Sequence, residues 1–301
     1  MKVLLTGANG QVGNALIRTK PSHIDLYPTS RSNLELSNPQ DCFDMVKAIK
    51  PDWIINSGAY TFVDKAEKEP ELAIAINAGA PKAFANAILK EGGKLLQIST
   101  DFVFDGSQSV PYTPSSMRSP INVYGESKAK GEIEIENLLT NRNQSVILRT
   151  SWVMGPTRTN FALTMLKLHI EKNIISVVAD QVGSPTTTAT LSDAIWKIIS
   201  MNSDIQDCSN GSPQVLHWCN SGVASWYDIA IAVGEISEEI GLINKKANVL
   251  PIQTINYPTP AKRPTYSILD NSLTQEKLRL TPIHWRKALK DLLIDYQLKN
   301  K

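Results

Sequence analysis

A tyrosine and a lysine four residues apart offer the clearest proton chemistry in this sequence. Tyr124 and Lys128 follow Pro120-Ile121-Asn122-Val123, which predicts the start of a helix running toward residue 140. Four residues apart on a helix, the two side chains stand on one face, one turn from each other. A nearby ammonium favours phenolate and lowers the phenol pKa below its ordinary value of about 10. The pair predicts a general acid, although a solvated helix face carries the same spacing.

Two further features stand beside this pair. Gly125 follows the tyrosine directly, where we expect the missing side chain to let a ligand approach, because glycine costs roughly 1 kcal/mol in a helix interior. Ser99, Thr100 and Asp101 follow a predicted strand over residues 94–98. Open α/β sheets bind ligands at the carboxyl ends of their strands. These polar groups therefore either contact a substrate or cap the loop.

The elements that must position these groups begin with a glycine loop. Residues 2–5 predict a buried strand, followed by a tight turn and a helix. Glycine lets a pyrophosphate approach the backbone, and the free N–H groups of the helix favour the anion. The spacing is GxxGxxG, and glycines that only pack a strand against a helix give the same pattern. The predicted cofactor-binding residues here are Gly7, Gly10, Gln11, Val12 and Gly13.

A second strand is predicted over residues 23–28, and Arg31 follows it. In NAD-binding units an acid about twenty residues beyond the glycines holds the ribose 2′-hydroxyl, whereas arginine suits a 2′-phosphate. No acidic residue lies between Tyr27 and Asn33. Arg31 therefore favours NADPH over NADH, although an exposed arginine without a ligand fits the sequence too.

Further helices and strands alternate along the first half. Helices are predicted over residues 38–50 and 70–91, and a third strand over 53–56. The small residues at 57–61 either contact a ligand or form a tight turn. In the second half, helices are predicted over 160–172, 226–240 and 284–298, and an exposed loop over 202–213. His169 is expected to be a packed or surface residue, because no second ligand stands at metal-binding spacing.

The composition is that of an ordinary globular chain. Its 301 residues suit one large α/β unit or two unequal domains. A net charge of +2 argues against a nucleic-acid or anionic-membrane partner and favours a small molecule. No stretch approaches the roughly 20 apolar residues of a membrane span, so we expect a soluble, cytoplasmic protein. Cys42, Cys208 and Cys219 fit reduced thiols, although the last two could pair.

The motifs described above occur in the order of a known family. TGxxGxxG, the Ser/Thr cluster and YxxxK resemble the extended short-chain dehydrogenase/reductases. Segments 56–67, 99–106, 122–125, 149–153, 181–186, 225–227 and 263–271 resemble the dTDP-4-dehydrorhamnose reductase family in particular. The resemblance implies a Rossmann-type doubly wound parallel sheet. It places an NAD(P)-binding domain over 1–153 and a mainly substrate-binding, discontinuous domain over 154–301, with strands near 174–180 and 215–219 added to the first.

The resemblance also implies a reaction. It is hydride transfer from NADPH, or NADH, to the C4 ketone of a nucleotide-linked deoxysugar, most closely dTDP-4-dehydro-6-deoxy-L-mannose, which would give dTDP-L-rhamnose. Tyr124 would protonate the alkoxide, Lys128 would hold the nicotinamide ribose and depress the phenol pKa, and Thr100 would hydrogen-bond the carbonyl oxygen. Ala59 and Tyr60 are further implied cofactor residues. The implied substrate-binding residues are Thr61, Val63, Asp101, Phe102, Trp152 and Arg263.

Three departures from the family pattern limit what the resemblance implies. Some members bind Mg²⁺ through acids at two places where this chain has Ala15 and Thr188-Ala189-Thr190-Leu191. We therefore predict no Mg²⁺ site, and a monomer or a metal-independent homodimer. Phe102 stands where the family often has tyrosine, and Arg31 bears on NADPH against NADH. On the loop at 251–264, Lys262 and Arg263 suit a diphosphate or a solvated surface equally.

Two alternatives to this activity remain. One is a reductase that makes a different nucleotide deoxysugar, because few residues around the sugar decide the product. The other is a non-catalytic NADP-binding subunit like the methionine adenosyltransferase β-subunit, which resembles the same family. An intact set of Thr100, Tyr124 and Lys128 favours an enzyme.

Overall fold

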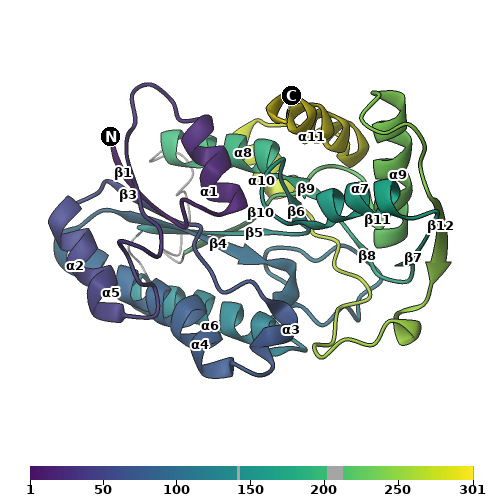
Figure 1. The fold of residues 1–301 in the computed structure, drawn as a ribbon. Helices are drawn as coiled ribbons and strands as arrows, with labels where there is room; N and C mark the ends of the chain where they lie inside the picture. The colour runs from purple at the N-terminus through teal and green to yellow at the C-terminus, as the bar shows by residue number, and fades with distance from the viewer. Residues whose placement is uncertain (141–142, 202–212, 301) are drawn as a thin grey trace.

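A six-stranded parallel sheet forms the centre of the protein (Figure 1). The computed structural model describes residues 1–140, 143–201 and 213–300. The strands lie in the order β10-β5-β4-β3-β1-β2. Their bounds are β1 (Lys2–Thr6), β2 (Asp25–Pro28), β3 (Trp53–Asn56), β4 (Lys94–Thr100), β5 (Ser145–Thr150) and β10 (Gln214–His217). The strand order reverses between β1 and β3, which is where doubly wound sheets bind ligands. The predicted Rossmann-type fold is confirmed.

Helices cover both faces of this sheet because its strands are apolar on both sides. Val3 and Leu5 of β1 belong to a core on one face, whereas Leu4 belongs to a core on the other. The first face carries α1 (Gln11–Arg18), α8 (Thr188–Met201) and α10 (Ser272–Leu278), and the second carries α2 (Pro39–Ile49), α5 (Ala80–Glu91) and α6 (Val123–Leu138) (Figure 1).

The predicted helix over residues 70–91 is continuous but is not α-helical throughout. Between α4 (Pro70–Ile74) and α5, residues Ala75–Gly79 form a π-helical turn. Pro81 has no N–H to donate to the carbonyl of Asn77, four residues before it. That carbonyl instead faces α6 so closely that a Cβ on Gly131 would lie 2.2 Å from its oxygen. The π-helical turn therefore lies where the two helices pack.

The same 22-residue helix corrects the expectation about membrane spans. It is long and apolar enough to cross a membrane, with a mean hydropathy of 1.3 in its most apolar window. Within the protein, 61% of that window is buried. Its burial against the sheet and α6 is typical of a core helix.

The second half of the chain builds a separate apolar core. Helices α7 (Phe161–Glu171), α9 (Trp226–Glu239) and α11 (Trp285–Lys299) pack with the two-stranded sheet of β7 (Ile174–Val178) and β12 (Asn248–Ile252) (Figure 1). Short pairs join this region together: β6 (Val153–Met154) with β9 (Thr186–Thr187), and β8 (Val182–Gly183) with β11 (Ala224–Ser225). Between β3 and α4 lies α3 (Val63–Ala66). The domain boundary at residue 153 stays a prediction.

One strand assignment was wrong and several bounds shifted. β10 joins the large sheet beside β5 as predicted, but β7 pairs with β12 instead. Exposed and buried residues alternate along β7, whereas the central strands are buried on both faces. The second strand begins at Asp25, and the fourth extends to Thr100. Of the predicted loop at 202–213, all but its last residue lies outside the described residues, as does Cys208; Cys42 and Cys219 are free and buried.

Candidate active site

The glycine loop packs β1 against β3 and leaves the start of α1 open to an anion. Gly7 has φ +67°, and a Cβ there would lie 2.7 Å from Cα of Gly58, so this glycine brings β1 and β3 together. A Cβ on Gly13 would lie 2.2 Å from the carbonyl oxygen of Gly7. A Cβ on Gly10, in contrast, would have only that carbonyl oxygen within 4 Å among the described residues, at 3.1 Å. Gly10 is the N-cap of α1, and no described side chain caps this helix start. The free N–H groups of this first turn suit an anion.

The residues between these glycines are held by the rest of the fold. The side chain of Gln11 accepts hydrogen bonds from the backbone N–H of Gly155, at 2.8 Å, and from Asn160 Nδ2, at 3.0 Å. Val12 packs against the apolar core on the face of the sheet that α1 covers. Both side chains thus support α1, and their backbone N–H groups are what the helix start offers to a ligand.

Ala59 and Tyr60 lie at the carboxyl end of β3, beside the glycine loop. Asn77 accepts a hydrogen bond from the Tyr60 N–H at 2.9 Å and donates one to its carbonyl at 3.0 Å. The Tyr60 hydroxyl donates to Glu69 at 2.7 Å. Burial and Glu69 together raise the pKa of Tyr60 to about 12. The Tyr60 phenol is therefore occupied within the protein, and its backbone is the part fixed at the sheet edge.

Thr100, Tyr124 and Lys128 come together at the carboxyl end of β4. The Thr100 hydroxyl lies close enough to Tyr124 to lower the pKa of its phenol. Lys128 is buried one turn further along α6, and its Nζ donates to the carbonyl of Ile98 at 2.6 Å. The alternative that Tyr124 and Lys128 lie on a solvated helix face is therefore wrong, because this face of α6 packs on the end of β4.

The pKa values in this cluster differ from the expectation. Burial raises the pKa of Tyr124 to about 12 and the charge of Asp101 raises it further, whereas the nearby Thr100 hydroxyl lowers it. We expected Lys128 to lower the pKa of Tyr124, but in the protein without ligand it does not. Burial also lowers the pKa of Lys128 to about 8, which the charge of Glu132 partly offsets. At neutral pH the phenol is protonated and the lysine still carries its charge.

Gly125 has a different role from the one predicted. A Cβ at this position would lie 2.1 Å from the carbonyl oxygen of Phe102. The missing side chain therefore admits the backbone of the turn Asp101–Val103, and not a ligand. This close approach brings Tyr124 beside the end of β4 and packs its ring edge-to-face against Phe102, with centroids 5.6 Å apart.

Asp101 is the most unusual polar residue of the cluster. It is 2% exposed, and burial raises its pKa to about 6, although the hydroxyls of Ser267 and Thr100 hold it partly down. Its Oδ1 accepts from Thr100 at 3.1 Å, and its Oδ2 is buried without a hydrogen-bond partner among the described residues. An unpaired buried carboxylate oxygen costs free energy unless a ligand pairs with it.

The other predicted substrate residues lie on separate segments of the chain. Thr61 is exposed after β3, and Val63 begins α3. Trp152 lies two residues beyond the end of β5 and stacks on Trp226. Arg263 is already engaged: its Nη2 lies 2.6 Å from Asp64 in α3, and a second bond joins the pair. This ion pair lowers the pKa of Asp64 and ties the loop of the second half to the first.

Comparison with known proteins decides the family. The model of the RmlD substrate binding domain matches residues 1–298. The dTDP-4-dehydrorhamnose reductase of Escherichia coli (strain K12) is 36% identical over 300 residues, which cover 97% of this chain and 97% of that protein. The chain belongs to the dTDP-4-dehydrorhamnose reductase family.

Solved structures agree with this membership. The dTDP-4-dehydrorhamnose reductase of Bacillus anthracis, solved in complex with NADP, is 37% identical and has a TM-score of 0.88, over 98% of this chain and 99% of that chain. A UDP-glucose 4-epimerase of Thermus thermophilus is 14% identical with a TM-score of 0.80, over 99% of each chain. The second similarity shows the fold alone.

Within this family, two of the predicted departures can be placed in the structure. Ala15 is a buried residue of α1, and the hydroxyl of Thr190 donates to the carbonyl of Thr187 and to Asn220 Oδ1. The described residues hold no group of three His, Cys, Asp or Glu side chains that could bind a metal. Arg31 follows β2 beside the glycine loop, where it is exposed and pairs with Glu35 at 3.7 Å. The absence of Mg²⁺ and the choice of NADPH stay predictions.

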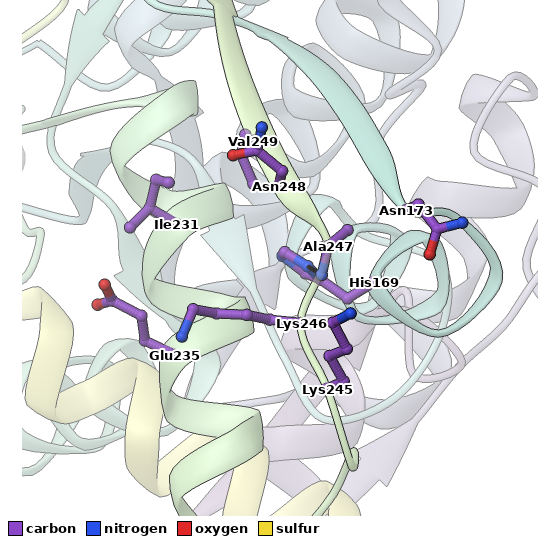
Figure 2. A pocket seen from close by; sticks show the side chains of 9 residues that line it. All are labelled: His169, Asn173, Ile231, Glu235, Lys245, Lys246, Ala247, Asn248 and Val249. Atoms are coloured by element: carbon purple, nitrogen blue, oxygen red, sulfur yellow. Dashed lines mark hydrogen bonds between the residues drawn. The ribbon is translucent and has the colours of Figure 1, made fainter.

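A hollow lies away from these residues, in the second half of the chain. This cavity of about 400 Å³ is bordered by α7, α9 and the chain entering β12 (Figure 2). His169 lies at its wall, where its Nε2 bonds to the carbonyl of Ala230 at 2.9 Å and its Nδ1 accepts from the N–H of Ala247 at 3.1 Å. The histidine is packed, which confirms one of the two predicted alternatives.

A buried ionic cluster behind the site was not predicted from the sequence. Glu132, 0% exposed, accepts hydrogen bonds from Arg149 at 2.9 and 2.7 Å, and others from Ser99 and Arg118. Two signals could have found it. Glu132 stands one turn beyond Lys128, and Arg149 is the one basic residue in an otherwise uncharged strand. The cluster fixes α6 against β4 and β5.

Proposed function

We propose that this chain reduces the C4 ketone of dTDP-4-dehydro-6-deoxy-L-mannose to a hydroxyl group, with NADPH as the reductant. The product is dTDP-L-rhamnose. The observation that carries the proposal is the proximity of the Thr100 and Tyr124 hydroxyls at the carboxyl end of β4, with the buried Lys128 one turn away. Membership of the dTDP-4-dehydrorhamnose reductase family supports the substrate class.

The residues around the switch point fit a dinucleotide. The uncapped start of α1 at Gly10 suits a pyrophosphate, and no acidic residue in its first turn would repel one. Arg31 would pair with a 2′-phosphate, which requires it to exchange its exposed ion pair with Glu35 for the ligand. Ala59, Tyr60 and Lys128 would line the nicotinamide end. When bound, NADPH supplies the hydride.

The residues of the chain supply everything else in the reaction. Thr100 and Tyr124 place two hydroxyl groups near one carbonyl oxygen. As the C4 carbon gains the hydride, the C=O electron pair moves to oxygen, and Tyr124 transfers its phenolic proton to that oxygen. A pKa of about 12 keeps this proton on Tyr124 until an alkoxide forms. The Lys128 ammonium then stabilises the tyrosinate that remains.

The substrate would be held by groups that the structure leaves available. The buried Oδ2 of Asp101 would accept a hydrogen bond from a sugar hydroxyl. Phe102, Thr61, Val63 and Trp152 would border the sugar. Arg263 would reach a diphosphate only by sharing its charge with Asp64, so its role depends on that ion pair.

The test supplies the purified chain with NADPH and the keto sugar nucleotide. Loss of NADPH absorbance should accompany formation of dTDP-L-rhamnose, identified by NMR of the product. Tyr124→Phe should lower kcat by at least about a hundredfold, as expected for loss of a general acid. Tyr296→Phe, in the second core, is the matched control and should keep wild-type kcat. Absent turnover, another sugar as product, or an unaffected Tyr124→Phe variant would contradict the proposal.

The finer expectations are tested in the same assay. We infer a cytoplasmic protein. We also infer a monomer or a metal-independent homodimer, because Ala15 and Thr190 supply no carboxylate for Mg²⁺. Chelation with EDTA should leave activity and mass in solution unchanged. Arg31→Ala should reduce the preference for NADPH over NADH about tenfold, the effect of one lost ion pair with a phosphate. An unchanged preference would remove Arg31 from the cofactor site.

A further inference from the structure

Trp152 has a backbone conformation that its neighbours must impose. Its φ is +48°, in the left-handed region that bulky side chains rarely adopt. Hydrogen bonds hold it on both sides: the Ser151 hydroxyl donates to the carbonyl of Ser184, and the N–H of Thr186 donates to the carbonyl of Trp152 at 3.2 Å. Strain of this kind persists where the surrounding structure fixes it, often at ligand sites.

Both faces of the Trp152 ring are covered by protein. Trp226, the first residue of α9, stacks on one face with ring centroids 3.6 Å apart and planes 3° from parallel. A Cβ on Gly183 would lie 2.6 Å from Cε2 of Trp152 and 2.9 Å from both Cζ2 and Nε1. Nearly equal distances to three adjoining ring atoms place that position over a ring face. Since Trp226 occupies one face, the backbone of Gly183 covers the other.

The two stacked indoles differ in their N–H groups. The Nε1 of Trp226 donates to Gln181 at 3.1 Å, and Gln181 in turn donates to Thr254 at 3.1 Å. The Nε1 of Trp152 has no hydrogen-bond partner among the described residues. It is not one of the side-chain atoms in these residues that are both unpaired and fully buried. It is therefore a donor that remains accessible. Buried indole N–H groups usually have a partner, so an accessible one beside a site suggests a ligand.

Trp152 lies at the edge of the sheet where the reaction is proposed to occur. In the sheet register Thr150, two residues before it, is opposite Thr100. A ring held at this edge with both faces covered has only its rim to offer. The family resemblance predicted that Trp152 would lie against the sugar, and that prediction left open which part of the ring makes the contact.

We propose that Trp226 and Gly183 are positioning residues for Trp152: they clamp its indole so that it meets the nucleotide sugar as a hydrogen-bond donor through Nε1–H. The proposal rests on the proposed function and names how this site recognises its substrate. The acceptor is an oxygen of the sugar or of the diphosphate. Stacking of the sugar on the ring face is the arrangement that this geometry excludes.

The direct test observes the indole N–H groups by NMR. The chain has six tryptophans, so the ¹⁵N-labelled protein should give six indole signals, with those of Trp152 and Trp226 assigned from Trp152→Phe and Trp226→Phe. On saturation with dTDP-L-rhamnose, the Trp152 proton should move downfield more than any other and exchange more slowly with water. A response to dTDP alone assigns the acceptor to the diphosphate, and a response only to dTDP-L-rhamnose assigns it to the sugar.

Two results would overturn the proposal, and they differ from each other. If other signals shift at saturation while that of Trp152 keeps its position and exchange rate, the clamp does not present a donor. If no signal responds to any nucleotide sugar, the proposed function itself fails and this inference with it.

Variants of the clamp give an independent readout. Trp226→Leu should raise the KM for the nucleotide sugar about tenfold, the effect of one misplaced hydrogen bond, with little change in kcat or in the KM for NADPH. Gly183→Ala should act in the same direction because its methyl group meets the Trp152 ring. Trp226→Phe keeps an aromatic stack and should restore most of the affinity.

The matched control is Trp285→Phe, which alters a tryptophan of the same core away from Trp152. It should keep the wild-type KM. Thermal unfolding of each variant checks that the fold is retained. A Trp226→Leu protein that is folded and has an unchanged KM would contradict the clamp.

Discussion

The backbone of Phe102 occupies the space that a side chain on Gly125 would need. A Cβ there would lie 2.1 Å from the Phe102 carbonyl oxygen, well inside the contact distance. This contact sets how closely α6 approaches the turn after β4, and therefore how Tyr124 reaches Thr100. The position of Tyr124, the proposed general acid, depends on an absent side chain.

Gly125→Ala should therefore lower kcat more than the small size of the added methyl group suggests. The methyl group must push α6 away from Phe102, and a displacement of about 1 Å at a reacting group can cost roughly a hundredfold in rate. We expect kcat to fall by about that factor while the circular dichroism spectrum is retained. Gly79→Ala is the matched control, because the nearest atom to its Cβ would be 4.0 Å away and its backbone is helical. That variant should keep wild-type activity; equal losses in both proteins would refute the argument.

Asp101 should make the protein less stable as the pH rises toward neutrality. Its folded pKa of about 6 lies above the value of about 3.9 in an unfolded chain, so the folded protein binds more protons between those values. Its stabilising contribution is full below about pH 4 and is lost as the pH rises through about 6. Asp101→Asn cannot ionise, and should raise the free energy of unfolding at pH 7 by up to about 3 kcal/mol.

The control for Asp101 is its neighbour Asp105, whose pKa is shifted the other way. Hydrogen bonds from Ser107 and Tyr112 lower the pKa of Asp105. Its contribution to stability is present above the unfolded pKa and is lost as the pH falls, so Asp105→Asn should destabilise the protein at pH 7. Denaturant unfolding across pH measures both effects. Equal signs for the two variants would show that burial does not control Asp101.

Binding of NADPH should weaken as Lys128 loses its charge. Burial lowers the pKa of Lys128 to about 8 in the protein without ligand, so neutral lysine predominates above that pH. The dissociation constant for NADPH should therefore rise as the pH increases through about 8, measured by fluorescence titration. Lys128→Met should bind weakly with no such inflection. An inflection that survives in Lys128→Met would assign it to another group.

The buried pair of Glu132 and Arg149 should be costly to break. Removing one partner leaves the other charge buried without compensation, so Glu132→Gln should lose about 3–5 kcal/mol of unfolding free energy. Replacing both with methionine should cost less than that single change. Glu134 is on the same helix as Glu132, and Glu134→Gln, which breaks an exposed ion pair with Lys82 of α5, should cost under about 1 kcal/mol. Equal losses in the two glutamate variants would contradict the buried cluster.

Much of the chemistry was predictable because it depends on local spacing. Tyr124 and Lys128 share a face because a helix repeats every 3.6 residues, and the strands of the sheet are visible as short apolar runs. The glycine loop, the polar cluster after β4 and the missing acid at Ala15 are likewise properties of single segments. These features were sufficient to predict the fold class, whereas the roles of the site residues stay predictions.

Tertiary structure alone decided how those residues behave. The raised pKa of Tyr124 comes from burial by segments distant in the chain, and it reverses the effect expected from Lys128. Gly125 faces Phe102, Arg263 pairs with Asp64 across 199 positions, and Trp226 stacks on Trp152. Nothing in the local spacing of these residues indicates such contacts, because packing and desolvation depend on which distant surfaces meet. The sequence by itself determined the residue types available for a ketone reduction; their geometry and charge states were settled by the fold.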